Sequence, residues 1–304
     1  MANTTVIGCF HDYDYEQIKP WINSLKRTGF SGDICLVVLR GKYELVKKLN
    51  KQGITIFSQE PDDNGNIEFS PGVSAENSMS VRFGICANFI RNYCKSKNVV
   101  FADVKDVIFQ SNPEELFNSY QDSHIIVAEE GFKYIDEPWS KNNMISSYGD
   151  PYYERMKNIS IVCAGVIAGK KDFVADLFDN IYAWCSISNY TGTVPGGGGP
   201  DQSALNIILN QRLYSVVTQK TRHILHAGTS IPGIKAGHSD IGLDVKNNPE
   251  KMKIYEDLFG LSSYPILNSE GQIINENNGN PYIIVHQYDR IPEWKKIILE
   301  KYKD

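Results

Sequence analysis

The sequence contains little cysteine, and no two cysteines are spaced for metal binding or redox chemistry. Six cysteines occur in 304 residues, at positions 9, 35, 86, 94, 163 and 185, and none belongs to a CxxC pair. No second Cys or His lies near any of them at zinc-finger spacing, which argues against a zinc finger. Cys9, Cys35 and Cys163 lie inside apolar runs. We therefore expect buried, reduced thiols rather than disulfides.

Long hydrophobic runs and a strong charge of either sign are also missing. No window approaches the roughly 18 apolar residues of a membrane span. The first residues, MANTTVIGCFHDYD, lack the basic start and apolar stretch of a signal peptide. The 31 basic and 36 acidic side chains give a net charge of -5, which argues against nucleic acid or an anionic membrane as the partner. These absences predict a soluble, cytoplasmic protein.

Glycine-rich phosphate motifs are absent as well. No G-x-G-x-x-G follows the first apolar run, which disfavours a dinucleotide-dependent oxidoreductase. The four glycines at 196–199 are not preceded by a strand or followed by Gly-Lys-Ser/Thr, so they do not form a P-loop. Two interpretations of this segment stay open: a loop that closes over bound substrate, or an inert flexible loop.

Short apolar runs alternate with segments of helical spacing along the whole chain. The predicted strands cover residues 4–10, 34–39, 54–57, 99–102, 125–128, 161–168 and 213–217, and the predicted helices cover 15–27, 43–50, 77–93, 172–183 and 201–210. This alternation predicts an α/β fold with a mostly parallel central sheet flanked by helices. The chain shows no sharp composition break, so we expect one domain over residues 1–304. Residues 228–280, rich in Gly, Pro and Asn, receive no clear assignment.

The most informative segment is a buried strand that ends in acid. Residues 99–102 are apolar, Asp103 follows at once, and Asp106 comes three residues later. Ligands of open α/β sheets bind at the carboxyl ends of the strands. Two carboxylates there suit Mn²⁺ or Mg²⁺ carrying a diphosphate. The alternative is a simple turn in which Asp106 caps the following segment.

The segment FADVKDVIFQSNP (residues 101–113) resembles the D-x-[RK]-D-V-x-F-Q-x-[ND]-P segment of GT-A-fold glycosyltransferases, a variant of their D-x-D metal motif. Four further segments resemble this family in order and spacing: SVRF (80–83), CAGVIAG (163–169), PDQSALN (200–206) and VHQYDR (285–290). The resemblance covers roughly residues 4–300. It implies a GT-A-like fold in which residues up to about 110 bind the nucleotide and residues from about 111 shape the donor-sugar and acceptor pockets.

The resemblance also implies roles for individual residues. Asp103, Asp106 and His286 would bind Mn²⁺ or Mg²⁺, and the nucleotide-sugar would be bound by Cys9, Phe10, His11, Arg82, Asp103, Gly165 and Gln202. The sequence departs from the family pattern in two places. Its two acids are separated by two residues rather than one, and Cys163 replaces the usual Asn of its strand.

Several of these residues have a structural alternative. Arg82 lies in an apolar helix, where its guanidinium must meet an anion: a diphosphate, a sugar-binding carboxylate, or simply Asp103. His286 follows the apolar run 282–285 and is either a metal ligand or a structural histidine. His11 follows the first strand and either contacts the base or lies in a surface turn, while Cys9 and Phe10 would frame the base through their backbone.

Three acids are candidates for sugar binding or general-base catalysis. Asp201 begins a predicted helix, where it could also be only an N-cap. Glu129 and Glu130 follow the strand 125–128, so one of them is expected to enter the cleft. Whether the reaction inverts or retains the anomeric configuration stays open.

The sequence thus predicts a glycosyltransferase that moves a sugar from a nucleoside diphosphate to a hydroxyl of a glycan or another acceptor. One alternative is a nucleotidyltransferase that makes the activated sugar, although the acidic HDYDYE segment (residues 11–16) replaces the basic glycine-rich loop of such enzymes. The other alternative is a carbohydrate-binding protein without catalytic activity, for which 17 Tyr and 4 Trp would supply stacking surfaces.

Overall fold

The computed structural model describes residues 3–69, 75–192, 198–227, 265–275 and 278–304. The strands are β1 (Thr4–His11), β2 (Asp33–Lys42), β3 (Thr55–Phe57), β4 (Asn66–Glu68), β5 (Asn98–Ala102), β6 (Val107–Phe109), β7 (Ile125–Lys133), β8 (Ser160–Lys170), β9 (Thr218–Lys220), β10 (Ile224–His226), β11 (Pro265–Leu267), β12 (Ile273–Asn275) and β13 (Ile284–His286). The helices are α1 (Tyr15–Arg27), α2 (Tyr43–Asn50), α3 (Ala75–Asn92), α4 (Glu115–Ser119), α5 (Pro138–Tyr148), α6 (Asp150–Met156), α7 (Lys171–Ser186), α8 (Asp201–Leu209), α9 (Arg212–Ser215) and α13 (Pro292–Lys301), and a 3₁₀ turn, η1, covers Tyr288–Arg290.

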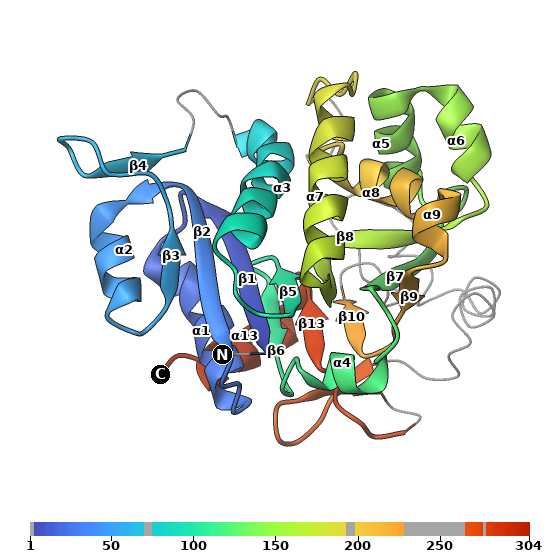
Figure 1. The fold of residues 1–304 in the computed structure, drawn as a ribbon. Coiled ribbons are helices and arrows are strands. Elements are labelled where there is room, and N and C mark those ends of the chain that lie inside the picture. The colour runs from blue at the N-terminus through green and yellow to red at the C-terminus, as the bar shows by residue number, and fades with distance from the viewer. Residues whose placement is uncertain (1–2, 70–74, 193–197, 228–264, 276–277) are drawn as a thin grey trace.

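The central sheet has the order β3-β2-β1-β5-β8-β7-β9, and β4 adds to β2 (Figure 1). Strands β3, β2, β1 and β5 are parallel to their neighbours in this group. β8 pairs antiparallel with both β5 and β7, and β9 pairs parallel with β7. This mostly parallel sheet agrees with the predicted fold class, because a parallel neighbour requires a crossover segment such as a helix.

Helices cover both faces of this sheet. One face packs on α3, α7 and α8 through residues such as Phe83, Phe178 and Leu205. The opposite face packs on α1 and α2, with Trp21 and Leu49 in the second core cluster. Strands buried on both faces explain why the segments in β1, β2 and β5 are almost continuously apolar.

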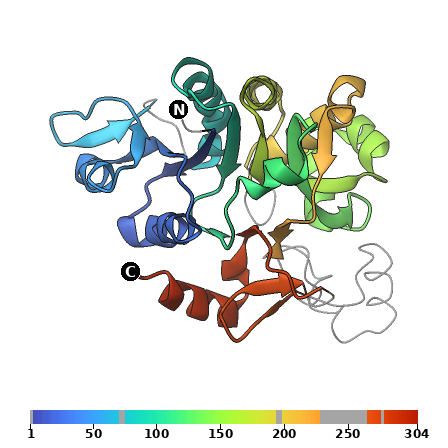
Figure 2. The ribbon, with the colours of Figure 1, turned by 60° about the horizontal axis from the view of Figure 1, so that its bottom comes forward.

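A second, small sheet places the C-terminal part of the chain beside the end of β5. Its order is β10-β13-β6, with β13 parallel to β10 and antiparallel to β6. Helix α13 then runs back beside α1 (Figure 2), where the carbonyl of Tyr302 accepts a hydrogen bond from Asn23. Strands β6 and β13, which lie more than 170 positions apart in the sequence, are thereby neighbours in the structure.

Most predicted elements lie within a few residues of their predicted bounds, but the prediction of a strand at 213–217 was wrong. Residues 212–215 form the short helix α9, and the strand β9 begins only at Thr218. Leu213 and Val216 are 72% and 77% exposed. Their apolar character therefore does not reflect a place in the sheet.

The cysteine prediction is confirmed, because all six cysteines are buried and free. Among the described helices, none is both long enough and apolar enough to cross a membrane.

Candidate active site

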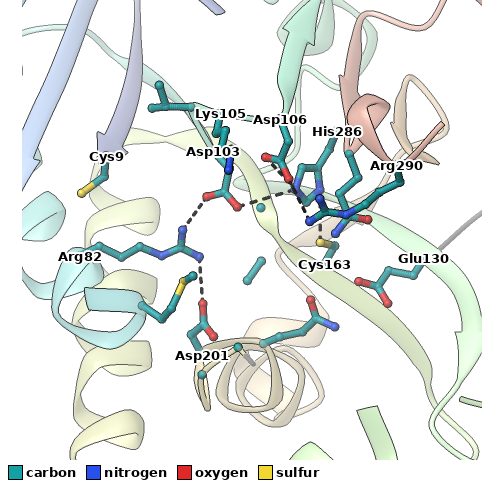
Figure 3. Close-up of a pocket in the computed structure, with 18 of the residues that line it drawn as sticks. Cys9, Arg82, Asp103, Lys105, Asp106, Glu130, Cys163, Asp201, His286 and Arg290 are labelled. Carbon is teal, nitrogen blue, oxygen red and sulfur yellow. Dashed lines mark hydrogen bonds and ion pairs between the residues drawn. The ribbon is translucent and has the colours of Figure 1, made fainter. Parts of the chain in front are cut away.

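A cleft of about 380 Å³ opens at the carboxyl ends of β1 and β5 and is lined by charged residues from several segments. The end of β1 contributes Cys9, α3 contributes Arg82, and the connection from β5 to β6 contributes Asp103 and Asp106 (Figure 3). Strands β7 and β8, the start of α5, the residues up to and including the start of α8, and the segment from His286 to Arg290 also contribute to the lining. The cleft thus lies where ligands of α/β sheets bind.

Two carboxylates and an imidazole meet at the centre of the cleft. The Nε2 atom of His286 lies 3.6 Å from Oδ1 of Asp106 and 3.7 Å from Oδ2 of Asp103. One ligand atom from each of the three side chains lies within 4.8 Å of the others. Because burial is the largest effect, the pKa of Asp106 is raised, although His286 opposes the rise. A cation placed among these groups would relieve the cost of burying the carboxylate.

Backbone pairing explains why these three residues meet. The amide of Asp103 donates to the carbonyl of Gly165 in β8, at 2.8 Å, and so continues the β5–β8 ladder beyond Ala102. His286 pairs with Val107 in the small sheet, and the amide after His286 donates to the carbonyl of Asp106 at 2.7 Å. Asp106 and His286 are therefore held by the same pair of strands.

The donor set fits a divalent cation of the Mn²⁺ or Mg²⁺ class. Two carboxylates and one imidazole offer hard oxygen and borderline nitrogen ligands at one point, with the open cleft on the remaining side. Mg²⁺ favours carboxylates and phosphate oxygens, whereas an imidazole ligand favours the transition-metal ions. The ligand atoms of these three side chains are therefore suited to a cation of this class.

Gly165 is a glycine because His286 leaves no room for a side chain. A Cβ atom built on Gly165 would lie 2.3 Å from Cε1 and 2.7 Å from Nε2 of His286. We expect Gly165→Ala to push the imidazole off the acids and to lower Mn²⁺ affinity by at least about tenfold, since even outer-shell changes typically cost 10- to 100-fold. Mn²⁺ titration followed by electron paramagnetic resonance (EPR) measures this.

The control is Gly41→Ala, a glycine of β2 whose nearest side chain, that of Val38, would lie 3.3 Å from the new Cβ. It should bind Mn²⁺ as the wild type does. Equal affinities in both variants would mean that His286 does not contact the ion.

Arg82 is buried and forms a bridge between two acids. Its two terminal nitrogens donate to Oδ1 of Asp103 at 2.6 Å and to Oδ2 of Asp201 at 2.9 Å. Burial opposes the charge of Arg82, but Asp103 and Asp201 outweigh it and raise the pKa of the guanidinium. Burial also raises the pKa of Asp201, which Arg82 partly offsets. The ion pair between Arg82 and Asp103, which was the structural alternative for this residue, is therefore observed. Arg82 also forms a second ion pair, with Asp201.

Asp201 is not an N-cap, because α8 begins at Asp201 itself and Pro200 precedes it. The helix has another link to the site through Asn206, whose side chain exchanges two hydrogen bonds with the backbone of Val162 in β8, at 2.8 and 2.7 Å. Asn206 thus fixes α8 against the strand that carries Cys163 and Gly165. Of the PDQSALN segment, Asp201 and Gln202 line the cleft and Asn206 holds them there.

Glu130 is the buried acid on the other side of the cleft. Burial and the nearby Glu137 raise its pKa to about 7, while hydrogen bonds with Cys163 and Gln202 lower it. A carboxyl group that titrates near neutral pH can hold or release a proton under physiological conditions. Glu130 is therefore suited to acid–base chemistry.

Not every predicted residue lies in the cleft. Glu129, the neighbour of Glu130 on β7, forms an ion pair with Lys220 and does not line the cleft. Phe10 packs in the core between the sheet and α1. His11 lies 3.6 Å from a carboxylate oxygen of Asp12 and is also absent from the lining. Of the glycines at 196–199, the first two lie outside the described residues, and Gly198 and Gly199 line the cleft beside Trp139 and Met79.

The cleft contains residues that the sequence analysis did not select. Arg290 extends from η1, and one of its terminal nitrogens lies 3.7 Å from Oδ2 of Asp106. Tyr13, Glu137 and Trp139 also line the cavity. Arg290 belongs to the VHQYDR segment, four residues after His286. The 3₁₀ turn that follows β13 brings it back to the site, and such a turn has no clear sequence signal.

Comparisons with protein-family models and with the sequences of curated proteins give no match. Solved structures do match. The bifunctional glycosyltransferase WbbM is 12% identical with a TM-score of 0.51, over 98% of this chain and 50% of that chain. The glycosyltransferase GlyE of Streptococcus pneumoniae TIGR4 is 13% identical with a TM-score of 0.50, over 100% of this chain and 63% of that chain.

A third similar structure is the galactosyltransferase LgtC, determined in complex with donor and acceptor sugar analogs. It is 12% identical with a TM-score of 0.51, over 97% of this chain and 95% of that chain. This chain therefore spans nearly the whole of LgtC, but only half of WbbM and 63% of GlyE. At such low identities the comparisons establish the fold alone, and they confirm the predicted GT-A-like α/β fold.

Proposed function

We propose that this chain is a glycosyltransferase that binds a nucleoside-diphosphate sugar with a divalent cation and transfers the sugar to a hydroxyl acceptor. The observation that carries the proposal is the meeting of Asp103, Asp106 and His286 at the carboxyl end of β5, inside a cleft of ligand size. The shared fold with three solved glycosyltransferases supports it.

Asp103, Asp106 and His286 would hold Mn²⁺ or Mg²⁺. A bound cation would supply Lewis-acid stabilisation of the charge that builds on the departing nucleoside diphosphate. Arg290 lies at the outer side of Asp106 with 41% of its side chain exposed, so its guanidinium can turn toward a second anion and bind the diphosphate by paired hydrogen bonds.

The part of the cleft formed by residues up to about 110 would bind the nucleotide. Cys9 and Tyr13 line this part, and Tyr13 presents an aromatic ring on which a base can stack. Cys9 is 7% exposed, so its contribution would come mainly from its backbone. The remaining lining, from β7, β8, α5 and α8, would enclose the sugar and the acceptor.

Asp201 and Glu130 would have different roles in the part of the cleft that binds the sugar. Asp201 is held by Arg82, so its remaining lone pairs suit hydrogen bonds from sugar hydroxyls. Glu130 has a pKa raised to about 7, which matches the operating range of a general base. If the enzyme inverts, Glu130 is the better base to deprotonate the acceptor hydroxyl. If it retains, Glu130, Asp201 and Gln202 would position the sugar.

The raised pKa of Glu130 predicts a pH dependence of stability. The folded-state pKa is about 7 and the ordinary value is 4.5, so the folded protein holds the proton more tightly than the unfolded chain. The contribution of Glu130 to stability is then fully present below about pH 4.5 and is lost as pH rises through 7. The free energy of unfolding should fall by about 3 kcal/mol in total over this range. Glu130→Gln should remove this slope in urea unfolding at several pH values. The exposed Glu154→Gln should keep it, and an unchanged slope in Glu130→Gln would show that Glu130 titrates normally.

The experiment that tests the proposed function is a donor screen. A panel of nucleoside-diphosphate sugars is incubated with the protein, with Mn²⁺ and with chelator, and slow hydrolysis of each donor is followed by nucleoside-diphosphate release. We expect one class of donor to be hydrolysed only with the metal. No release from any donor, or release unaffected by chelator, would contradict the proposal. NMR of the released sugar's first-formed anomer decides between inversion and retention.

A carbohydrate-binding protein without activity would give a different calorimetric result. It should bind sugars but neither Mn²⁺ nor nucleoside diphosphates, whereas the proposed enzyme should bind the metal and the nucleotide cooperatively.

A further inference from the structure

A second group of potential metal ligands adjoins the acids of the cleft and shares only His286 with the cation site of the proposed function. It consists of Cys163 from β8, His226 from β10 and His286 from β13, all buried. His226 and His286 are register partners in the parallel pair β10–β13. Their rings stand nearly perpendicular, at 89°. In this orientation, Nδ1 of His226 lies 3.0 Å from Nδ1 of His286, and Sγ of Cys163 lies 3.5 Å from the same Nδ1.

These separations are close to the edges of a zinc coordination tetrahedron. With Zn–N distances of about 2.0–2.1 Å and a Zn–S distance of about 2.3 Å, two nitrogens lie about 3.3 Å apart and a nitrogen and a sulfur about 3.6 Å apart. The two separations in the structure, 3.0 and 3.5 Å, each differ from these values by only a few tenths of an ångström. Imidazole and thiolate are also the ligands that Zn²⁺ and similar ions prefer over Mn²⁺ or Mg²⁺.

From this geometry we infer that Cys163, His226 and His286 form a binding site for Zn²⁺ or another thiophilic divalent ion. On binding, the S–H bond of Cys163 breaks, a metal–sulfur bond forms, and the proton leaves through the cleft that Cys163 and His286 both line. The thiolate and the carboxyl group of Glu130, which is hydrogen-bonded to Cys163, supply the negative charge that a buried dication requires. The cleft itself gives the fourth position to water or a ligand.

The two metal sites share His286 through different nitrogens. Its Nδ1 faces Cys163 and His226, whereas its Nε2 faces Asp103 and Asp106. A neutral imidazole has one lone pair in its ring plane, so binding an ion through Nδ1 leaves the proton on Nε2. Zn²⁺ at the thiophilic site should therefore remove His286 from the Mn²⁺ site and inhibit the enzyme. This last consequence rests on the proposed function, but the thiophilic site itself does not.

The test uses Co²⁺ as a spectroscopic probe of the whole chain. A thiolate bound to Co²⁺ gives an intense near-ultraviolet charge-transfer band, which carboxylate and imidazole ligands do not give. We expect the wild type to show this band, Cys163→Ser and His226→Gln to lose it, and Zn²⁺ to bleach it. Zn²⁺ affinity should fall by more than about 100-fold in Cys163→Ser, because losing a ligand costs more than losing an outer-shell partner.

Two control variants separate this proposal from the proposed function. Asp106→Asn should lose Mn²⁺ binding but keep the cobalt–thiolate band. Cys35→Ser, which alters a buried cysteine of β2 outside the cluster, should keep both. A wild type that shows no thiolate band, or a band that survives in Cys163→Ser, overturns the proposal. Mn²⁺ binding that is unchanged in zinc-loaded protein overturns the shared use of His286.

Discussion

Replacing Asp106 by asparagine should reduce sugar transfer by at least about a thousandfold while leaving the protein folded. Lewis-acid stabilisation of a departing phosphate is worth several kcal/mol, and each 1.36 kcal/mol is a factor of ten in rate. The amide would keep the shape of the side chain but remove the charge that binds the cation. Because burial already raises the pKa of Asp106, neutralising this residue should not lower the free energy of unfolding. Initial rates of transfer and urea unfolding measure the two quantities.

The matched control is Asp176→Asn, the same change on an exposed acid of α7 that pairs with Arg91. It should leave the transfer rate within about twofold. Asp103→Asn should also reduce transfer strongly, and it removes a partner of Arg82 as well. Full activity of Asp106→Asn, with or without chelator, would contradict a catalytic metal at this site.

Replacing Arg82 by methionine should destabilise the protein strongly. The change leaves the carboxylates of Asp103 and Asp201 facing one another without the cation that now bridges them. Removing one partner of a buried ion pair typically costs about 3–5 kcal/mol, because an uncompensated buried charge remains. We expect a loss of about this size in urea unfolding near neutral pH, and weaker donor binding wherever the variant is folded.

Helix α3 supplies a matched control for this experiment. Arg91 also pairs with two aspartates, Asp176 and Asp179, but all three side chains are more than 40% exposed. Arg91→Met should cost no more than about 1 kcal/mol, since exposed ion pairs contribute little. Combining Arg82→Met with Asp201→Asn should recover part of the loss. Equal, small effects of Arg82→Met and Arg91→Met would mean that the Arg82 bridge is not a buried ion pair in solution.

Some of the site residues that the sequence selected lie at the ends of strands, whereas Arg82 and Asp201 lie on helices. Asp103 and His286 each follow or end an apolar run, and strands in this class of sheet deliver such residues to one edge. Arg82 could be selected because an apolar helix cannot leave a guanidinium without an anion. Continuous apolar runs reveal the strand positions well, and the resemblance to GT-A-fold glycosyltransferases supplied the expected metal-binding role of Asp103, Asp106 and His286.

Neighbouring residues on one strand differ in whether their side chains face the cleft. Successive side chains of a strand point to opposite faces of the sheet. Glu130 therefore faces the cleft while Glu129 meets Lys220, and Cys9 lies on the cleft side of β1 while Phe10 packs toward α1. The sequence predicts that one of Glu129 and Glu130 enters the cleft. It does not show which one, because both faces of this sheet are buried.

Two contacts between distant segments were not predicted from the sequence. The partnership of His226 with His286 depends on the pairing of β10 with β13, and these strands are only three residues long. The return of Arg290 toward Asp106 depends on a 3₁₀ turn. Neither β10 nor the 3₁₀ turn has a periodic pattern long enough to be recognised.

The most direct test of the central claim is an EPR titration of Mn²⁺ into the wild type and Asp106→Asn, with and without a nucleoside diphosphate. If Asp103, Asp106 and His286 form the cation site of a nucleotide-sugar enzyme, the wild type should bind one Mn²⁺ per chain, more tightly when the nucleoside diphosphate is present. Asp106→Asn should bind no Mn²⁺ at the same concentrations. Mn²⁺ binding that is absent from the wild type, or equal in the two proteins, would contradict the account.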